Sequence, residues 1–278
     1  MTRRRDALLA LPIAVFFALF VAAPLLLIGF VSLHDEPAMT HMGLAAYSRF
    51  VADAYNRGVL RDTLLLGAET VVLTVVLGYP VAGLYAASRR WRRPLMLLIL
   101  LPLLTSAVVR TFAWVVILGN QGLVNRALLS TGLIAAPWHL LYTPGAVAVA
   151  MAQIELPLMV LPLAGAIAAI DPRLLEASRA LGAGPWRGFL RVTLPLSVPG
   201  LLTGSLLVFT GAVSAFVTQT LVGGGRLMFM PFYIYEQAIQ AQDYPFAAAI
   251  AIVLLVAILG VVAVLGALGR RSAGYVHG

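Results

Sequence analysis

The sequence contains no cysteine, and only 11% of its residues are charged. The absence of cysteine excludes disulfide bonds and metal sites built from thiolates. No segment carries the phosphate-binding pattern Gly-x-x-x-x-Gly-Lys-Ser/Thr, because the glycine run at 223–225 is followed by an arginine and the chain has no lysine. We therefore expect this chain to bind no nucleotide or other cofactor.

Catalytic groups are equally scarce. The sequence has no His-Glu-x-x-His pattern, and all four histidines fall in polar segments or at the chain end: His34, His41, His139 and His277. No pairing of a nucleophile with a base can be assembled from these residues. This argues against an intramembrane enzyme and against a resident metal ion, and we expect no enzyme activity.

What the sequence has in abundance is apolar residues. The 278 residues are 61% hydrophobic, with a mean hydropathy of +0.96. A soluble domain of this composition would expose large aggregating patches, so the composition indicates a polytopic membrane protein. The net charge of +8 does not predict a nucleic-acid partner, because the arginines lie in short loops between apolar segments.

Six apolar segments are long enough to cross a bilayer as helices. The sequence thus predicts an all-α integral membrane protein with one transmembrane domain over residues 1–278 and spans near 7–33, 63–87, 94–118, 144–170, 199–221 and 245–268. The first segment resembles a signal peptide after its basic start, MTRRRD. It is too long for a signal peptide and has Pro24 where cleavage would occur, so we expect it to remain as a span.

The loops between these segments alternate in arginine content. One set collects most of the arginines: Arg3, Arg4, Arg5, Arg89, Arg90, Arg92, Arg93, Arg173, Arg179, Arg187, Arg191, Arg270 and Arg271. The other set has only Arg49, Arg57, Arg61, Arg126 and Arg226. The positive-inside rule places the first set in the cytoplasm. We therefore expect a multi-pass membrane protein with both termini in the cytoplasm.

The longest polar interruption in the second half is the segment 171–198, which falls on the cytoplasmic side. Asp171 can cap a helix that begins at Pro172, and Gly182 is expected to end that helix. Pro185 can open a second short helix, which Pro195 and Pro199 are expected to close. The segment therefore predicts a helix–glycine–helix elbow outside the bilayer.

The elbow carries Glu176-Ala177-Ser178, then Gly182-Ala183 and Leu194-Pro195-Leu196. This pattern resembles the "EAA" loop of the membrane subunits of bacterial ATP-driven (ABC) importers, with Ser178 in place of the second alanine. The resemblance implies a type I ABC importer permease fold in which 171–198 is the cytoplasmic coupling loop. The residues expected to couple to an ATPase are Glu176, Ala177, Ser178, Gly182, Ala183 and Arg187.

Other segments resemble the spermidine/putrescine-type permeases of the same family. They include 101–106, 109–114, 121–125, 156–163 and 205–209. The resemblance implies four kinds of partner: a second, similar permease subunit, two ATPase subunits that bind ATP and magnesium, an extracytoplasmic solute-binding protein, and the lipid bilayer.

Three ionisable residues fall inside the expected spans, where a charge is costly unless it is paired or faces a cavity. Glu69 and Arg110 lie at similar depth in adjacent spans, so they form either a structural ion pair or part of the translocation path. Glu155 lies near the middle of the fourth span, beside Pro157. It is either a buried protonated acid or an acid that faces the substrate.

The fifth span carries Thr203, Thr210, Ser214 and Thr218 at offsets that keep them on one helical stripe. Such a stripe either hydrogen-bonds neighbouring helices or lines a pore. The candidates for the substrate path are Glu69, Arg110, Trp114, Gln153, Glu155, Thr210, Ser214 and Phe216.

These residues leave the cargo open. Acids and aromatic rings favour a polyamine such as spermidine or putrescine, whereas Arg110 favours a zwitterionic or anionic solute such as an opine, a phosphonate or an amino-acid-like compound. Thiamine is a further alternative. A proton-coupled secondary transporter that uses Glu69 and Glu155 is an alternative of another class.

Overall fold

The computed structural model describes residues 13 and 15–273, and within this range the regular structure is helical. A single β-bridge between His34 and Met42 is the exception. The expected all-α fold class is thus confirmed for these residues. Arg3, Arg4, Arg5, His277 and the start of the first expected span lie outside the described residues. The described part forms two compact units, divided after Leu60 and again around Met230–Ala257.

The first unit contains the chain up to Leu60 and residues Met230–Ala257. Its elements are η1 (Ala18–Ala22), α2 (Ala23–Val31), α3 (Ala45–Ala52), the start of α4 (Ala54–Ala87), α13 (Met230–Tyr235), η4 (Glu236–Gln240) and the first part of α14 (Tyr244–Ala273), up to Ala257.

Two polar contacts tie α3 and the start of α4 to the later elements of this unit. Arg49 donates to the Asp243 carboxylate at 2.9 Å, and its guanidinium carbon lies 3.9 Å from the centre of the Phe246 ring. The Tyr233 hydroxyl donates to Asn56 Oδ1 at 2.7 Å. Burial raises the pKa of Tyr233, which keeps the phenol protonated and able to donate.

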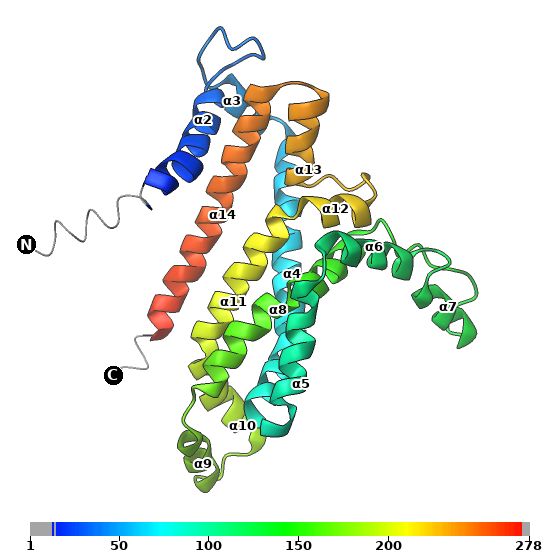
Figure 1. The fold of residues 1–278 in the computed structure, drawn as a ribbon, viewed down its shortest axis with the longest axis vertical. Coiled ribbons are helices and arrows are strands. Elements are labelled where there is room, and N and C mark those ends of the chain that lie inside the picture. Colours follow the sequence, from blue (N-terminus) through cyan, green and yellow to red (C-terminus); the bar gives the residue numbers. More distant parts are fainter. Residues whose placement is uncertain (1–12, 14, 274–278) are drawn as a thin grey trace, which may run out of the picture. The chain divides into compact units, whose positions relative to one another are not determined.

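The second unit contains the remaining helices. They are most of α4, then α5 (Arg89–Leu100), the 3₁₀ turn η2 (Leu101–Leu104), α6 (Ala107–Leu118), α7 (Leu123–Ser130), α8 (Pro144–Ala168), α9 (Pro172–Ala180), α10 (Pro185–Gly188), the π turn η3 (Phe189–Thr193), α11 (Leu194–Ser214), α12 (Phe216–Gly223) and the rest of α14 from Ile258. Within this unit, Figure 1 shows α9 and α10 at one end of α8 and α11, with α6 and α12 at the other end.

Five of the described helical segments are long and apolar enough to cross a membrane, and Val15–Val31 is a shorter apolar helix. The fourth expected span, 144–170, matches α8, and the sixth, 245–268, matches α14. The second begins earlier than expected: α4 starts at Ala54, so the loop expected to reach residue 62 is partly helical.

The third expected span, 94–118, is not one helix, which corrects the sequence prediction. The chain leaves the helical conformation at Thr105 and Ser106, whose ψ angles are 144° and 132°. Pro102 lies just upstream, in a 3₁₀ turn, and lacks the N–H that would continue an α-helix. The apolar segment is therefore divided into α5 and α6. Helix α6 carries Arg110 and Trp114, two of the candidates for the substrate path.

The elbow and the fifth span also differ from the prediction. Pro195 and Pro199 do not close the second elbow helix, because Pro195 occupies the first turn of α11 and Pro199 is accommodated inside it. The helical segment runs without interruption from Pro185 to Ser214. It ends at Ala215, where ψ is 99°, so the expected span 199–221 is divided into α11 and α12.

Helix α8 is the centre of the second unit. Of its most apolar stretch, 67% is buried, against 33% for the segment Pro185–Ser214. Many of its buried residues are alanines, which let neighbouring helices approach closely.

Three glycines of α11 face α8 at spacings of four and seven residues, which places them on one helix face. A Cβ atom at Gly200 would lie 2.6 Å from the Pro162 carbonyl oxygen, and one at Gly204 would lie 2.8 Å from the Met159 sulfur. Gly211 lies equally close to the carboxylate of Glu155. The two helices can therefore pack at this distance only because α11 has no side chains at these three positions.

We expect Gly200→Val to lower the free energy of unfolding of the detergent-purified protein by about 1–3 kcal/mol, because the added side chain overpacks against the α8 backbone. Gly165→Val on α8 is the matched control, since a Cβ there meets nothing within 4 Å. Thermal unfolding of both variants checks this. Equal melting temperatures for Gly200→Val and Gly165→Val would contradict the close contact.

Candidate functional site

The elbow has the helix–glycine–helix form that the sequence predicts. The Asp171 carboxylate accepts a hydrogen bond from the Arg173 backbone N–H at 2.9 Å and so caps α9. At the other end of α9, the N–H of Gly182 donates to Arg179 O and the N–H of Ala183 donates to Ser178 O. These two bonds form a Schellman motif, which requires a left-handed residue after the helix. Gly182 supplies it, with φ +79°.

Ser178 lies at the inner side of the bend. Its hydroxyl donates to Leu175 O at 2.8 Å, and a Cβ at Gly188 would lie 3.5 Å from it. A residue much larger than serine at 178 would therefore push α9 away from α10. This gives a physical reason for a small side chain here, where the family pattern has alanine.

The outer side of the elbow exposes both charged and large apolar side chains. Glu176, Ala177 and Arg187 are exposed. Leu181 and Trp186 are exposed by 87% and 69%, which is unusual for side chains of this size. The bend therefore presents two large apolar groups beside charged ones.

An aromatic contact series connects the elbow to the spans of the same unit. Trp186 stacks on Phe189 with ring centres 5.5 Å apart, and Phe189 meets Tyr79 of α4 edge-on at 5.1 Å. The Tyr79 hydroxyl lies 2.5 Å from Ser197 Oγ on α11. The elbow is thus fixed to both α4 and α11 by its own side chains.

A second group of residues lies inside the helical bundle, around Glu155. This side chain is buried, with 9% exposed, and its carboxylate packs on Gly211 of α11. From the other side, Arg110 of α6 donates to the Ile154 carbonyl at 3.2 Å, and its positive charge acts on the Glu155 carboxylate. Glu155 thus comes from α8 and Arg110 from α6, and α11 packs against the carboxylate of Glu155.

Two further hydrogen bonds hold this group together. The Trp114 indole N–H donates to Gln153 Oε1 at 3.1 Å, and the hydroxyls of Thr111 and Thr218 lie 2.9 Å apart. Four of the expected substrate-path residues, Arg110, Trp114, Gln153 and Glu155, are therefore brought together. The contact of Thr111 with Thr218 and the position of Gly211 against Glu155 could not be read from the sequence, because in both cases the partner lies far away in the chain.

Of the two alternatives for Glu69 and Arg110, the ion pair is not found among the residues that the structure describes. Arg110 reaches α8 instead. Glu69 lies on the exposed face of α4 with Val72 and Val76. Equal depth does not bring two residues together when they lie on different faces of their helices.

The polar stripe of the fifth span needs a correction as well. Thr203, Thr210 and Ser214 donate to carbonyl groups of their own helix, at 2.9, 2.8 and 2.6 Å. They do not cross-link helices within the described chain. Thr218 does so, but it lies on α12, beyond the helix break at Ala215. Phe216 begins α12 and is 37% exposed.

No group of three or more potential metal ligands occurs among the described residues. The elbow offers a surface for another protein, and the α6–α8–α11 group offers a buried acid beside an arginine.

We expect a double-mutant cycle to detect the electrostatic interaction between Arg110 and Glu155. Arg110→Gln and Glu155→Gln should show a coupling of at least about 0.5 kcal/mol in thermal unfolding, because the two charges share one buried space. Arg110→Gln and Glu69→Gln should be additive. Additivity in the first cycle, or coupling in the second, would show that the assignment of Arg110 to Glu155 is incorrect.

Comparisons with known proteins agree with this geometry. Residues 74–273 match the family described as "Binding-protein-dependent transport system inner membrane component". The spermidine/putrescine transport system permease protein PotB of Escherichia coli is 35% identical over 246 residues, which covers 87% of this chain and 89% of that protein. The molybdenum transport system permease protein ModB of Mycobacterium tuberculosis is 36% identical over 211 residues, or 74% and 76% of the two chains.

Among solved structures, the chain resembles one from a bacterial ABC transporter involved in the import of the acidic polysaccharide alginate. The TM-score is 0.75 at 23% identity, with 96% of each chain covered. This likeness concerns the fold. Together with the family match and the PotB relatives, it shows that the chain belongs to the binding-protein-dependent transport system inner membrane components, the permease subunits of such transporters.

Proposed function

We propose that this chain is the permease subunit of an ATP-driven importer for a polyamine such as spermidine or putrescine. The elbow at 171–198 docks on a separate ATPase subunit. The observation that carries this proposal is the elbow itself, with its Schellman bend at Gly182 and its exposed Leu181 and Trp186. The PotB relatives, 35% identical over 87% of the chain, support the cargo.

The elbow is suited to transmit a movement. ATP-driven closure of two ATPase subunits is a rigid-body motion that must act on a stiff part of the permease. The helix from Pro185 to Ser214 is continuous over 30 residues, or about 45 Å at 1.5 Å per residue. A displacement of α10 therefore moves α11, and the contact of Phe189 with Tyr79 extends it to α4.

The moving helix reaches the buried acid directly. Gly211 on α11 lies against the carboxylate of Glu155, so a shift of α11 alters the space around this side chain. Thr210 and Ser214 are on the same helix, one residue before and three residues after Gly211. We assign Trp114, Gln153, Glu155, Thr210, Ser214 and Phe216 to the substrate path on this basis, and we add Glu69, an exposed acid within a span.

Polyamine cargo also agrees with the surroundings of Arg110. Its guanidinium donates to the Ile154 carbonyl and its charge acts on Glu155, so groups of the chain offset the cation in part. No ion pair joins Arg110 to Glu155 among the described residues, and the buried Arg110 Nε has no hydrogen-bond partner there. Glu69 remains as an exposed acid within a span and is available to a cationic solute. The geometry gives less support to an anionic cargo, which would need Arg110 to be open, or to a proton relay, because Glu69 and Glu155 lie on separate faces.

The complete transporter requires other chains. We infer six spans, with Val15–Val31 forming part of the first, and both termini and the elbow in the cytoplasm of a bacterium, as the arginine distribution predicts. A second homologous permease, two ATPase subunits and an extracytoplasmic binding protein complete the assembly. ATP and magnesium are held by the ATPase subunits.

We expect Gly182→Val to abolish ATP-dependent uptake while the protein still inserts into the membrane. A β-branched residue at φ +79° is strained by at least about 1–2 kcal/mol, so the bend of the elbow is lost. Gly184→Val is the matched control, because its φ of −67° suits any residue and a Cβ there meets nothing within 4 Å. Normal uptake by Gly182→Val in vesicles energised with ATP would refute the coupling role.

Uptake of labelled spermidine at low external concentration tests the cargo. Cells that lack this chain should lose the high-affinity component of spermidine uptake, and Glu69→Gln should raise the apparent KM by about tenfold if one charge–charge contact of about 1.4 kcal/mol is lost. Putrescine, thiamine, an aminophosphonate and an opine serve as competitors. Unchanged spermidine uptake in the deletion strain would exclude polyamine cargo.

A further inference from the structure

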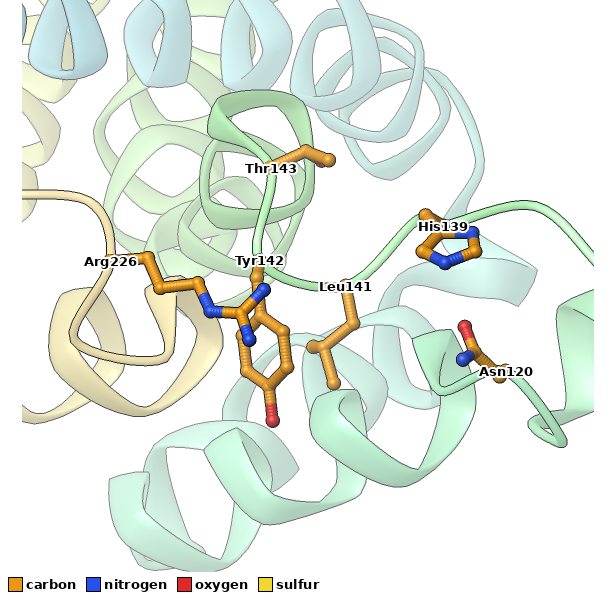
Figure 2. A pocket seen from close by; sticks show the side chains of 6 residues that line it. All are labelled: Asn120, His139, Leu141, Tyr142, Thr143 and Arg226. Carbon is orange, nitrogen blue, oxygen red and sulfur yellow. The ribbon is translucent and has the colours of Figure 1, made fainter.

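A cavity of about 540 Å³ lies away from both groups of residues described above. It is lined by Asn120, His139, Leu141, Tyr142, Thr143 and Arg226. Figure 2 shows the Arg226 side chain lying across Tyr142, with His139 and Asn120 on the other side of Leu141. The lining residues come from the connection between α6 and α8 and from the loop after α12.

The backbone around this cavity is held firmly. Asn125 is fully buried, and its side-chain amide bonds both the N–H and the carbonyl of Trp138, at 2.9 and 3.0 Å. The Thr143 hydroxyl donates to Leu140 O at 2.7 Å and also caps α8. These hydrogen bonds hold the long connection from α7 to α8 in a defined conformation, and it forms one wall of the cavity.

Tyr142 joins this wall to the loop after α12. Its backbone N–H donates to Val222 O at 3.2 Å, and its ring is in contact with Gly224. Tyr142 has φ +65°, a left-handed conformation that is strained for an aromatic residue. Backbone strain of this kind persists where the surroundings impose it, and it is concentrated at binding sites.

The charge of the cavity is positive and uncompensated. The Arg226 guanidinium carbon lies 5.6 Å from the centre of the Tyr142 ring, and no described carboxylate forms an ion pair with it. The segments 119–143 and 223–229 contain Arg126, Arg226 and His139 but no aspartate or glutamate. An incoming carboxylate would therefore meet donors and no competing acid.

The cavity lies at the end of α8 opposite to the elbow. It borders Thr143, which caps the first residue of the helix, whereas the elbow follows Ala168, its last residue. If the elbow is cytoplasmic, the cavity opens to the outside. A polyamine carries several positive charges and is repelled by Arg226, so the cargo itself is a poor occupant.

We propose that this cavity receives an acidic side chain of the extracytoplasmic solute-binding protein, with Arg226 as the charged contact and Tyr142 and His139 as its walls. This inference rests on the proposed function, since it requires a binding protein as partner. A cation fixed on an aromatic ring at the rim of a shaped pocket offers a carboxylate a defined docking position. It leaves the cationic cargo free to move past.

The test measures binding of the cargo-loaded solute-binding protein to the assembled transporter in nanodiscs, by surface plasmon resonance at low and high salt. We expect Arg226→Glu to weaken binding by about tenfold at low salt, mostly by lowering the association rate. At high salt the loss of affinity should be smaller, because salt screens the charges. Arg126→Glu is the matched control. It makes the same charge change on an exposed arginine of the same face, outside the cavity.

The outcomes separate this inference from the proposed function. The docking site is supported if Arg226→Glu lowers the affinity for the binding protein and Arg126→Glu does not. Replacing one surface acid of the binding protein by arginine should then restore its affinity for the Arg226→Glu transporter. Equal losses for both variants would indicate diffuse attraction and overturn the site, as would no loss for either. If the binding protein does not bind the unaltered transporter at all, the proposed function fails. Tyr142→Phe, which keeps the ring, should retain binding and so controls for misfolding of the loop.

Discussion

The close contact between α8 and α11 is the constraint on which the second unit depends. Gly200, Gly204 and Gly211 allow the backbone of α11 to lie against α8 at distances that no side chain would permit. In a bilayer, apolar surface gains little from leaving lipid, so helices associate mainly through packing and polar contacts. This close contact sets where every residue of α11 lies relative to Glu155 of α8.

The pairing of α8 with α11 also connects the elbow to the buried acid. The helix that begins at Pro185 in the elbow is the same helix that carries Gly211 beside the buried acid. The π turn at Phe189–Thr193 and the prolines that follow do not interrupt it. Because Phe189 also contacts Tyr79, the elbow is connected to α4 as well as to α11. In the proposed function, one continuous helix rather than a chain of loops links the coupling elbow to the candidate substrate path.

Two helix breaks complete the site. The break at Thr105 and Ser106 gives α6 its own direction, which brings Arg110 to α8 rather than to α4. The break at Ala215 does the same for α12 and allows Thr218 to meet Thr111. Irregular backbone at membrane depth is tolerated only where protein or water surrounds it. The polar residues of the candidate path lie beside these breaks for that reason.

Local signals in the sequence were sufficient for the apolar segments that form α8 and α14, for the caps of α9 and for the bend at Gly182, because hydrophobic length, an Asp-Pro pair and a glycine act within a few residues of themselves. The helix breaks at Thr105 and Ala215 and the partners of Arg110 and Thr218 were not predictable in this way. Lipid and protein interior are both apolar, so a transmembrane helix shows little difference between its buried and exposed faces, and the sequence carries no record of how each helix is rotated. The pocket at Arg226 was not predictable from the sequence either. Segments about 80 residues apart form its walls, and only tertiary packing brings them together.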